Sequence, residues 1–288
     1  MGSLYGYEID SELPLRRLNA APGHRGAIAV RMAGNGLDER AGRVTAYVET
    51  EAGQAIYAGA ELSDGYLISI PNSAAFHVQP DERTIAVAPR GPNEEVEHRL
   101  GCSALCTMLA LRGDLSLHAS AVEEAGRAVL FCGPAGHGKS TLASALGELG
   151  HPVLCEDGAV VEVSGDGALA LPGPRGVRIR RRSDNRVRVS LVADPGPREP
   201  APCPVAAVAL LEERGVELRS ERLAPAEAVA LLTPHLIHTG GEASLATSFA
   251  RLGSLLRRVP AYRVSLPDDR AALPEASGQL LESLHANS

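Results

Sequence analysis

The feature that most constrains the fold is GPAGHGKST, residues 133–141, which follows the apolar run RAVLFC (127–132) and leads into STLASALGEL (140–149). It fits the pattern G-x-x-x-x-G-K-[ST] of a loop that holds phosphate groups between a strand and a helix. Glycines let the main chain turn its N–H groups toward a phosphate, and a helix N-terminus adds partial positive charge. The pattern predicts a strand, a phosphate-binding loop and a helix, in that order.

The lysine in this loop is the only one in the chain. Lysine and arginine together number 28, which leaves 27 arginines beside Lys139. A compact ammonium group can reach into a ring of backbone N–H groups, whereas guanidinium is a planar fork on a longer stem. An ordinary glycine-rich turn would tolerate arginine here, so the lone lysine favours a phosphate site over that alternative.

The motif assigns roles to individual residues. Lys139 is expected to bridge the β- and γ-phosphates of ATP, and Ser140 to bind Mg²⁺. We expect no chemistry from His137, which occupies a variable position of the pattern. The residues predicted to contact the nucleotide are Gly133, Pro134, Ala135, Gly136, His137, Gly138, Lys139, Ser140 and Thr141.

Two acids follow the next predicted strand. HPVLC (151–155) closes a short βαβ unit and ends in Glu156 and Asp157. Ligands of open α/β sheets bind at the carboxyl ends of strands. Two carboxylates there can hold Mg²⁺ and accept the proton of an attacking hydroxyl. The sequence leaves open which acid is base and which binds metal, and a solvated turn is the alternative to both.

The strand before the loop strand carries His118. LSLHASAVE (115–123) and RAVLFC are joined by only a tight turn, which predicts an antiparallel hairpin. Such a neighbour is unusual in an all-parallel nucleotide fold. Placed beside the loop strand, His118 could hydrogen-bond the catalytic acid or the γ-phosphate; the alternative is a satisfied core histidine.

An arginine-rich run, GVRIRRRSDNRVRVS (176–190), partly alternates and predicts one cationic face. It could bind nucleotide phosphates or an acidic substrate, with Arg178 or Arg180 stabilising charge on the transferred phosphoryl group. A solvated surface face is the alternative reading of the same run.

The remaining segments predict a division at about residue 95. Residues 1–95 form a small β-rich domain, because short runs rich in Val, Ile, Tyr and Thr alternate with turn residues. These predicted strands are AIAVRM, RVTAYVET, QAIYAGAEL, GYLISI and TIAVAP. Residues 96–288 form the second domain, with helices predicted over 96–113, 140–149, 224–236, 244–259 and 271–285, and with later strands at 158–163, 168–172, 204–212 and 261–266.

Composition limits the partners and the compartment. Apolar residues make up 44% and aromatic residues 3%, with no Trp, so the core must be aliphatic. The net charge of -7 argues against nucleic acid or an anionic membrane as the main partner. We expect a cytoplasmic protein, since no apolar run spans a bilayer, no signal pattern opens the chain and the five cysteines are unpatterned. The oligomeric state stays open, a homo-oligomer included.

Residues of about 116–163, LHASAVEEAGRAVLFCGPAGHGKSTLASALGELGHPVLCEDGAVVEV, resemble the core of HPr kinase/phosphorylase and its shorter relatives. The resemblance implies an α/β fold with a phosphate-loop mixed sheet of the phosphoenolpyruvate carboxykinase type. It implies nucleotide on Gly133–Thr141 and Mg²⁺ on Ser140 and one acid. Asp157 or Glu156 would then act as base toward a serine hydroxyl, with His118 nearby.

The chain departs from that family at three places, one of which is its N-terminal region. Glu156-Asp157 replaces a pair of aspartates, and the glycine-rich C-terminal signature that carries the catalytic arginine is not recognisable. HPr itself is therefore a doubtful substrate, and the sequence leaves open whether reverse phosphorolysis occurs. Similar short relatives occur in peptide natural-product pathways, including those of lasso peptides, where they phosphorylate a serine of a precursor peptide.

Three functions are compatible with these observations. The leading hypothesis is an ATP- and Mg²⁺-dependent kinase acting on a Ser or Thr hydroxyl of a peptide or protein, such as a lasso-type precursor. The second is a small-molecule hydroxyl kinase, although such kinases usually begin at the phosphate loop. The third is a nucleotide-gated regulatory module without catalysis.

Overall fold

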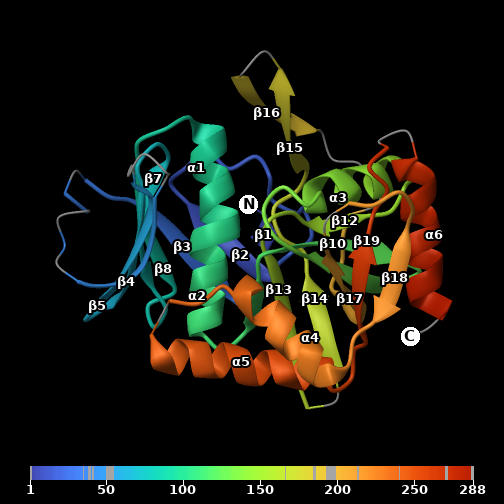
Figure 1. Cartoon of the computed structure of the whole chain (residues 1–288). Helices are drawn as coiled ribbons and strands as arrows, with labels where there is room; N and C mark the ends of the chain where they lie inside the picture. The colour runs from blue at the N-terminus through green and yellow to red at the C-terminus, as the bar shows by residue number, and fades with distance from the viewer. Residues whose placement is uncertain are drawn as a thin grey trace.

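The computed structural model describes residues 2–34, 36–37, 40, 42–49, 55–165, 167–183, 186–192, 199–212, 214–239, 241–269 and 272–286. Its chain forms two large mixed sheets, with a long helical segment between them and further helices outside the second sheet (Figure 1). The predicted α/β class with a mixed sheet is confirmed. None of the described helices combines the length and apolarity that a membrane crossing requires.

In the part of the chain that the structure describes, the first sheet has eight strands in the order β1-β2-β3-β8-β7-β6-β5-β4. β2, β3 and β8 run parallel and the other neighbours antiparallel. All five strands predicted for this region are present. The bounds are β1 Ser3–Leu4, β2 Tyr7–Ser11, β3 Ala27–Met32, β4 Arg43–Glu49, β5 Ala55–Leu62, β6 Gly65–Ile70, β7 Ala74–Gln79 and β8 Thr84–Pro89.

The helix predicted over 96–113 begins earlier and is interrupted. It consists of α1 (Asn93–Arg99), a π-helical segment (Leu100–Leu105) and α2 (Cys106–Leu111). A Cβ on Gly101 would lie 2.3 Å from Cγ of Pro174, so glycine permits this close approach. The segment covers one face of the first sheet, and one cluster includes Phe76, Val78, Leu100 and Leu105. Because that packing crosses residue 95, the two-domain division stays a prediction.

The second sheet contains the predicted hairpin. Its order is β12-β10-β11-β17-β14-β13-β9, with β19 beside β17 and β18 beside β19. β10 and β11 pair antiparallel from Ala119↔Cys132 to Glu124↔Arg127, which confirms the hairpin. The bounds are β9 Leu115–Leu117, β10 Ala119–Glu124, β11 Arg127–Cys132, β12 Val153–Cys155, β13 Ala159–Ser164, β14 Gly167–Leu171, β17 Cys203–Leu211, β18 Arg219–Arg222 and β19 Ala261–Ser265.

Two details of this region differ from expectation. The single strand predicted over 115–123 is broken at His118, because β9 pairs with β13 whereas β10 pairs with β11 and β12. The βαβ unit is present, but β10 lies between β11 and β12. The connection from β11 through α3 to β12 therefore passes over β10. As a result, β10 separates β12 from β11, the strand that leads into the loop.

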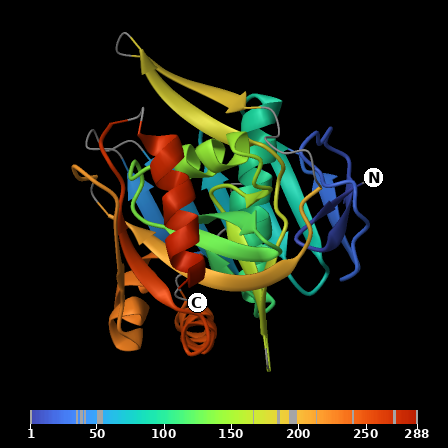
Figure 2. The same cartoon turned by 90° about the vertical axis from the view of Figure 1, so that its right-hand side faces the viewer.

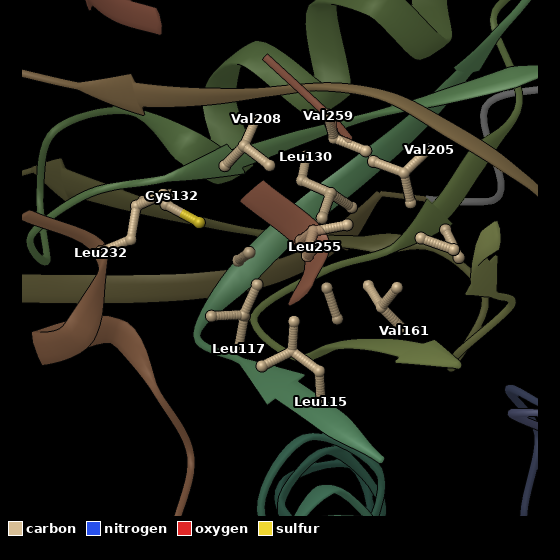
Figure 3. Close-up of a cluster of buried hydrophobic side chains, with 14 of the residues drawn as sticks. Leu115, Leu117, Leu130, Cys132, Val161, Val205, Val208, Leu232, Leu255 and Val259 are labelled. Atoms are coloured by element: carbon tan, nitrogen blue, oxygen red, sulfur yellow. The ribbon is translucent and has the colours of Figure 1, made fainter. Parts of the chain in front are cut away.

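Helices cover both faces of the second sheet. α3 (Lys139–Glu148) and α6 (Leu273–Ala286) pack on the face that carries Val129 and Phe131. α4 (Pro225–Leu232), a 3₁₀ turn (Thr233–His235) and α5 (Glu242–Leu256) follow the opposite face. There Leu130 and Cys132 join Leu232 and Leu255 in one aliphatic cluster (Figure 3). The alternation along β11 is that of a strand buried on both faces.

The arginine-rich run forms a two-stranded arm, β15 (Val177–Ser183) and β16 (Arg186–Val192), that projects from the body of the molecule (Figures 1 and 2). Arg178 pairs with Leu191 and Arg180 with Val189 in the backbone register. The side chains of this arm lie outside what the structure describes, so the roles expected for Arg178 and Arg180 stay predictions.

Candidate functional site

The loop between β11 and α3 depends on glycine at three positions. Gly133, Gly136 and Gly138 have φ values of 147°, 90° and 96°, a region that L side chains rarely adopt. Gly138 directly precedes the first helical residue, Lys139. Pro134 and Ala135 are exposed, while His137, Ser140 and Thr141 are half-buried. The expected strand, loop and helix are therefore present, with the loop at the carboxyl end of β11.

Lys139 is folded back onto its own loop. Its Nζ donates hydrogen bonds to the carbonyl oxygens of Gly133 at 2.7 Å and Pro134 at 3.1 Å, and the residue is 6% exposed. Burial lowers the pKa of Lys139, while the charge of Asp157 opposes that shift. The ammonium group is thus buried at the loop, close enough to Asp157 to interact with it electrostatically.

Asp157 lies between two histidines in a left-handed backbone conformation, with φ of 62°. His98 Nε2 is 3.3 Å from its Oδ2, and His118 Nε2 is 3.3 Å from its Oδ1. Burial would raise the pKa of Asp157, but the hydrogen bond from His98 and the electrostatic interactions with His118, His98 and Arg99 outweigh it. The pKa therefore lies well below its usual range, and the carboxylate is ionised at neutral pH.

His118 occupies the break between β9 and β10. Its backbone N–H donates to the carbonyl oxygen of His235 at 2.7 Å, which ties it to the 3₁₀ turn after α4. Burial lowers the pKa of His118, and the Lys139 charge reinforces this while Asp157 opposes it. The structure thus brings His118 and Asp157 into contact and places both within electrostatic range of Lys139.

Glu156 has a different environment from Asp157. It is 3% exposed, and its Oε2 lies 3.7 Å from Nη2 of Arg17. Cys102 Sγ approaches the backbone oxygen of Glu156 at 3.1 Å, and Tyr5 Oη donates to the carbonyl of Gly158 at 2.9 Å. The π-helical segment and the N-terminal segment therefore hold the backbone on both sides of Asp157. The Mg²⁺ role expected of Glu156 stays a prediction.

Four residues near the site were not singled out in the sequence. Arg17 and His98 lie behind the acids, and His235 and Arg214 lie beside the loop. Burial lowers the pKa of His235 to about 4, and the charges of Lys139 and His118 add to the effect. A Cβ on Gly138 would lie 2.8 Å from Nη2 of Arg214. No local pattern marks any of the four, because tertiary packing alone brings them to the loop.

The donor set fits a metal-bound nucleotide. Mg²⁺ in such sites takes one or two protein oxygens together with phosphate oxygens and waters. The ionised carboxylate of Asp157 and the hydroxyl of Ser140, in the first turn of α3, are oxygens of the required kind. Three glycines at positive φ and a buried ammonium suit a polyphosphate at the loop.

Comparison with known proteins gives little further information. No protein family and no curated protein matches the sequence. Among solved structures, the Hpr(Ser) kinase/phosphatase from Coxiella burnetii is similar to part of the chain, with 17% sequence identity and a TM-score of 0.32. The match covers 60% of this chain and 88% of that chain.

Proposed function

We propose that the protein is an ATP- and Mg²⁺-dependent kinase that transfers the γ-phosphate to a Ser or Thr hydroxyl of a peptide or protein. The observation that carries the proposal is the position of Asp157, held by two histidines and within electrostatic range of Lys139 on a glycine-rich loop. A cation for phosphate and an ionised carboxylate for an attacking hydroxyl are the two groups that phosphoryl transfer requires.

The loop would hold the phosphates of ATP. Lys139 would exchange its hydrogen bonds to Gly133 and Pro134 for phosphate oxygens, and the N–H groups of the first turn of α3 would face the same charge. Ser140 and Asp157 would hold Mg²⁺, which when bound neutralises charge that develops on the phosphates.

Asp157 would orient the acceptor hydroxyl and take its proton. The hydroxyl oxygen would form a bond to the γ-phosphorus as the bond from that phosphorus to the β-phosphate oxygen breaks, and ADP would leave. Phosphoryl transfer depends mainly on positioning and charge, so a weakly basic carboxylate suffices. His118 would donate its hydrogen bond to Asp157 at the more open side, since its side chain is 41% exposed. We therefore propose Asp157 as the base, and for Glu156 a supporting ion pair with Arg17.

Intact-mass analysis tests the proposal. The protein would be incubated with ATP, Mg²⁺ and Ser- or Thr-containing peptides, including lasso-type precursors, and we expect a gain of one phosphoryl group on the peptide. The same assay with hydroxylated metabolites separates a small-molecule kinase. ATP binding without transfer to any acceptor, together with a partner that binds only in the presence of ATP, would instead support the regulatory module.

A further inference from the structure

We propose that His98, held by Arg17, is a positioning residue that fixes the Asp157 carboxylate for phosphoryl transfer. The inference rests on the proposed kinase function. It adds that residues from outside the phosphate-loop segment hold the Asp157 carboxylate in place. His98 belongs to α1, and Arg17 to the segment between β2 and β3. Both lie far from Asp157 in sequence, and both are buried, at 3% and 5% exposure.

The hydrogen bonds determine which ring nitrogen of His98 carries the proton. Arg17 Nη1 lies 3.4 Å from His98 Nδ1, and a guanidinium group can only donate. Cys102 Sγ, 3.7 Å from the same nitrogen, already donates to the backbone oxygen of Glu156. With Arg17 as the donor, Nδ1 accepts, and the proton of the neutral ring is on Nε2. That nitrogen lies 3.3 Å from Oδ2 of Asp157. His98 in this tautomer donates to the carboxylate, and Arg17 selects the tautomer.

Arg17 is itself held on several sides. Its Nε donates to the carbonyl oxygen of Arg175, its Nη2 donates to that of Gly176 at 2.5 Å, and Glu156 lies 3.7 Å away. A buried guanidinium with these partners has little freedom to move. Arg17 therefore gives His98 a hydrogen-bond donor at a fixed position. The negative charge of Glu156 compensates the buried positive charge of Arg17.

The two histidines together fix the plane of the Asp157 carboxylate. His118 contacts Oδ1 and His98 contacts Oδ2, so rotation about the bond to the carboxyl carbon would break one contact or both. The His118 side is 41% exposed and the His98 side is 3% exposed. His98 therefore acts from behind, through Asp157, whereas His118 lies on the side that substrate can reach. Supporting hydrogen bonds of this kind typically contribute 10- to 100-fold to the function of the group they orient.

The chain contains a matched control. In the first sheet, Arg40 Nη1 lies 2.8 Å from Nδ1 of His77, and His77 Nε2 lies 3.2 Å from Oδ1 of Asp64. The His77 side chain is 4% exposed, close to that of His98. Ala74, Phe76 and Val78 on the same strand pack in the cluster with α1 and α2, so alternation puts His77 on the other face of the sheet.

The test compares His98→Phe, His98→Gln and His77→Phe with the wild-type protein in phosphoryl transfer to the peptide acceptor. His98→Phe should lower kcat by about 10- to 100-fold while KM for ATP stays within about twofold. His98→Gln, whose amide can donate toward Asp157, should recover part of that loss. His77→Phe should lower the thermal midpoint about as much as His98→Phe does, and it should keep the wild-type kcat. Equal kcat for His98→Phe and the wild type would overturn the inference and leave the kinase proposal standing.

Two further measurements keep the inference testable if His98→Phe fails to fold. Arg17→Met keeps the side-chain stem and removes the donors, and it should lower kcat in the same direction. The ¹⁵N chemical shifts of the His98 ring report the tautomer without any activity assay. We expect a protonated Nε2 and an unprotonated Nδ1; the opposite tautomer would overturn the inference even in an active kinase. A wild-type protein that neither binds ATP nor transfers phosphate would overturn the proposed function itself.

Discussion

The ammonium nitrogen of Lys139 lies 2.7 Å from the carbonyl oxygen of Gly133. The two residues stand at opposite ends of the glycine-rich loop between β11 and α3. The loop carbonyl oxygens thus satisfy the buried ammonium group. Under the proposed function, this contact would be exchanged for contacts with phosphate oxygens. Phosphate oxygens are stronger partners for an ammonium group than a neutral carbonyl, because the hydrogen bond is then assisted by charge on both sides. The first prediction follows from that exchange.

Replacement of Lys139 should separate ATP binding from fold stability. Lys139→Met removes a buried charge, so the thermal midpoint should stay the same or rise, while kcat/KM falls on the order of 100-fold. Lys139→Arg should also lose activity, because a planar fork does not fit where the ammonium now lies. Steady-state rates of phosphoryl transfer measure kcat/KM, calorimetric titration with Mg-ATP measures binding, and a thermal melt measures the midpoint. Arg127→Ala, an exposed cation at the opposite end of β11, serves as the control. Full activity of Lys139→Met would contradict the site.

Asp157→Asn should abolish transfer and weaken the response of stability to acid. Asparagine tolerates positive φ, so the backbone at this position should be kept. We expect kcat to fall by about 10²–10⁴-fold. The folded pKa of Asp157 lies below the 3.8 of the free side chain, so its contribution to stability is complete above that value and is lost as pH falls toward the folded pKa.

The matching measurement for Asp157 is urea unfolding at pH 7, 4 and 3. From pH 7 to pH 3, the free energy of unfolding should fall less for Asp157→Asn than for the wild-type protein. Identical losses would show that the carboxylate is not stabilised in the fold.

His235 should make the stability of the fold depend on pH in a higher pH range than Asp157 does. Its folded pKa of about 4 lies below the 6.5 of a free histidine, so the unfolded chain binds more protons between these values. Stability from this group is complete above about pH 6.5 and is lost as pH falls toward 4. Solvent screening of a half-buried group limits the effect to about 1 kcal/mol.

His235→Gln should remove that part of the pH dependence, and His24→Gln, at an exposed position, should not. Because the Lys139 charge contributes to the shift, Lys139→Met should raise the pKa of His235 in an NMR titration. An unchanged pKa in that variant would place the two side chains farther apart than the structure does.

The local part of this architecture could be predicted from the sequence, and the long-range part could not. The loop, its two flanking elements and the hairpin before it are encoded within about thirty residues, by turn glycines and apolar runs. The break at His118 could not be seen, because it arises where the chain changes partners from β13 to β11. β7 (AAFHVQ) was missed as well, since its alanines and histidine give a weak strand signal.

The same distinction holds for the site. His118 and Asp157 adjoin the phosphate-loop segment in sequence. Asp157 follows the end of a predicted strand, and His118 lies on the predicted strand that precedes the loop strand. His98 and Arg17 gave no signal, since a histidine within a helix and an arginine in a loop are ordinary in a chain so rich in arginine. Only the packing of α1 and of the segment between β2 and β3 places these two residues behind Asp157.

The glycines of the loop should differ in what they tolerate. A Cβ on Gly133 would lie 2.6 Å from the backbone oxygen of Leu211, whereas nothing lies within 4 Å of one on Gly136. Both have positive φ, so Gly136→Ala should cost about 1–2 kcal/mol from backbone strain alone. Gly133→Ala should cost roughly 1–3 kcal/mol more, because β17 must move. Urea unfolding of the two variants measures the difference. A smaller cost for Gly133→Ala than for Gly136→Ala would contradict the close approach of the loop to β17.

Arg214 should contribute to nucleotide affinity. Its Nη1 donates to the carbonyl oxygen of Pro267 at 3.1 Å, which holds the guanidinium in place, and its Nη2 lies beside Gly138 at the start of α3. A phosphate on the loop would meet this second cation, and one charge-assisted hydrogen bond corresponds to about tenfold in affinity. Arg214→Met should therefore raise the Kd for Mg-ATP by about tenfold with little change in thermal midpoint. Arg219→Met, which removes an exposed arginine paired with Glu217 at 2.9 Å, should leave the Kd unchanged. Equal Kd values for the two variants would mean that Arg214 faces away from the bound phosphates.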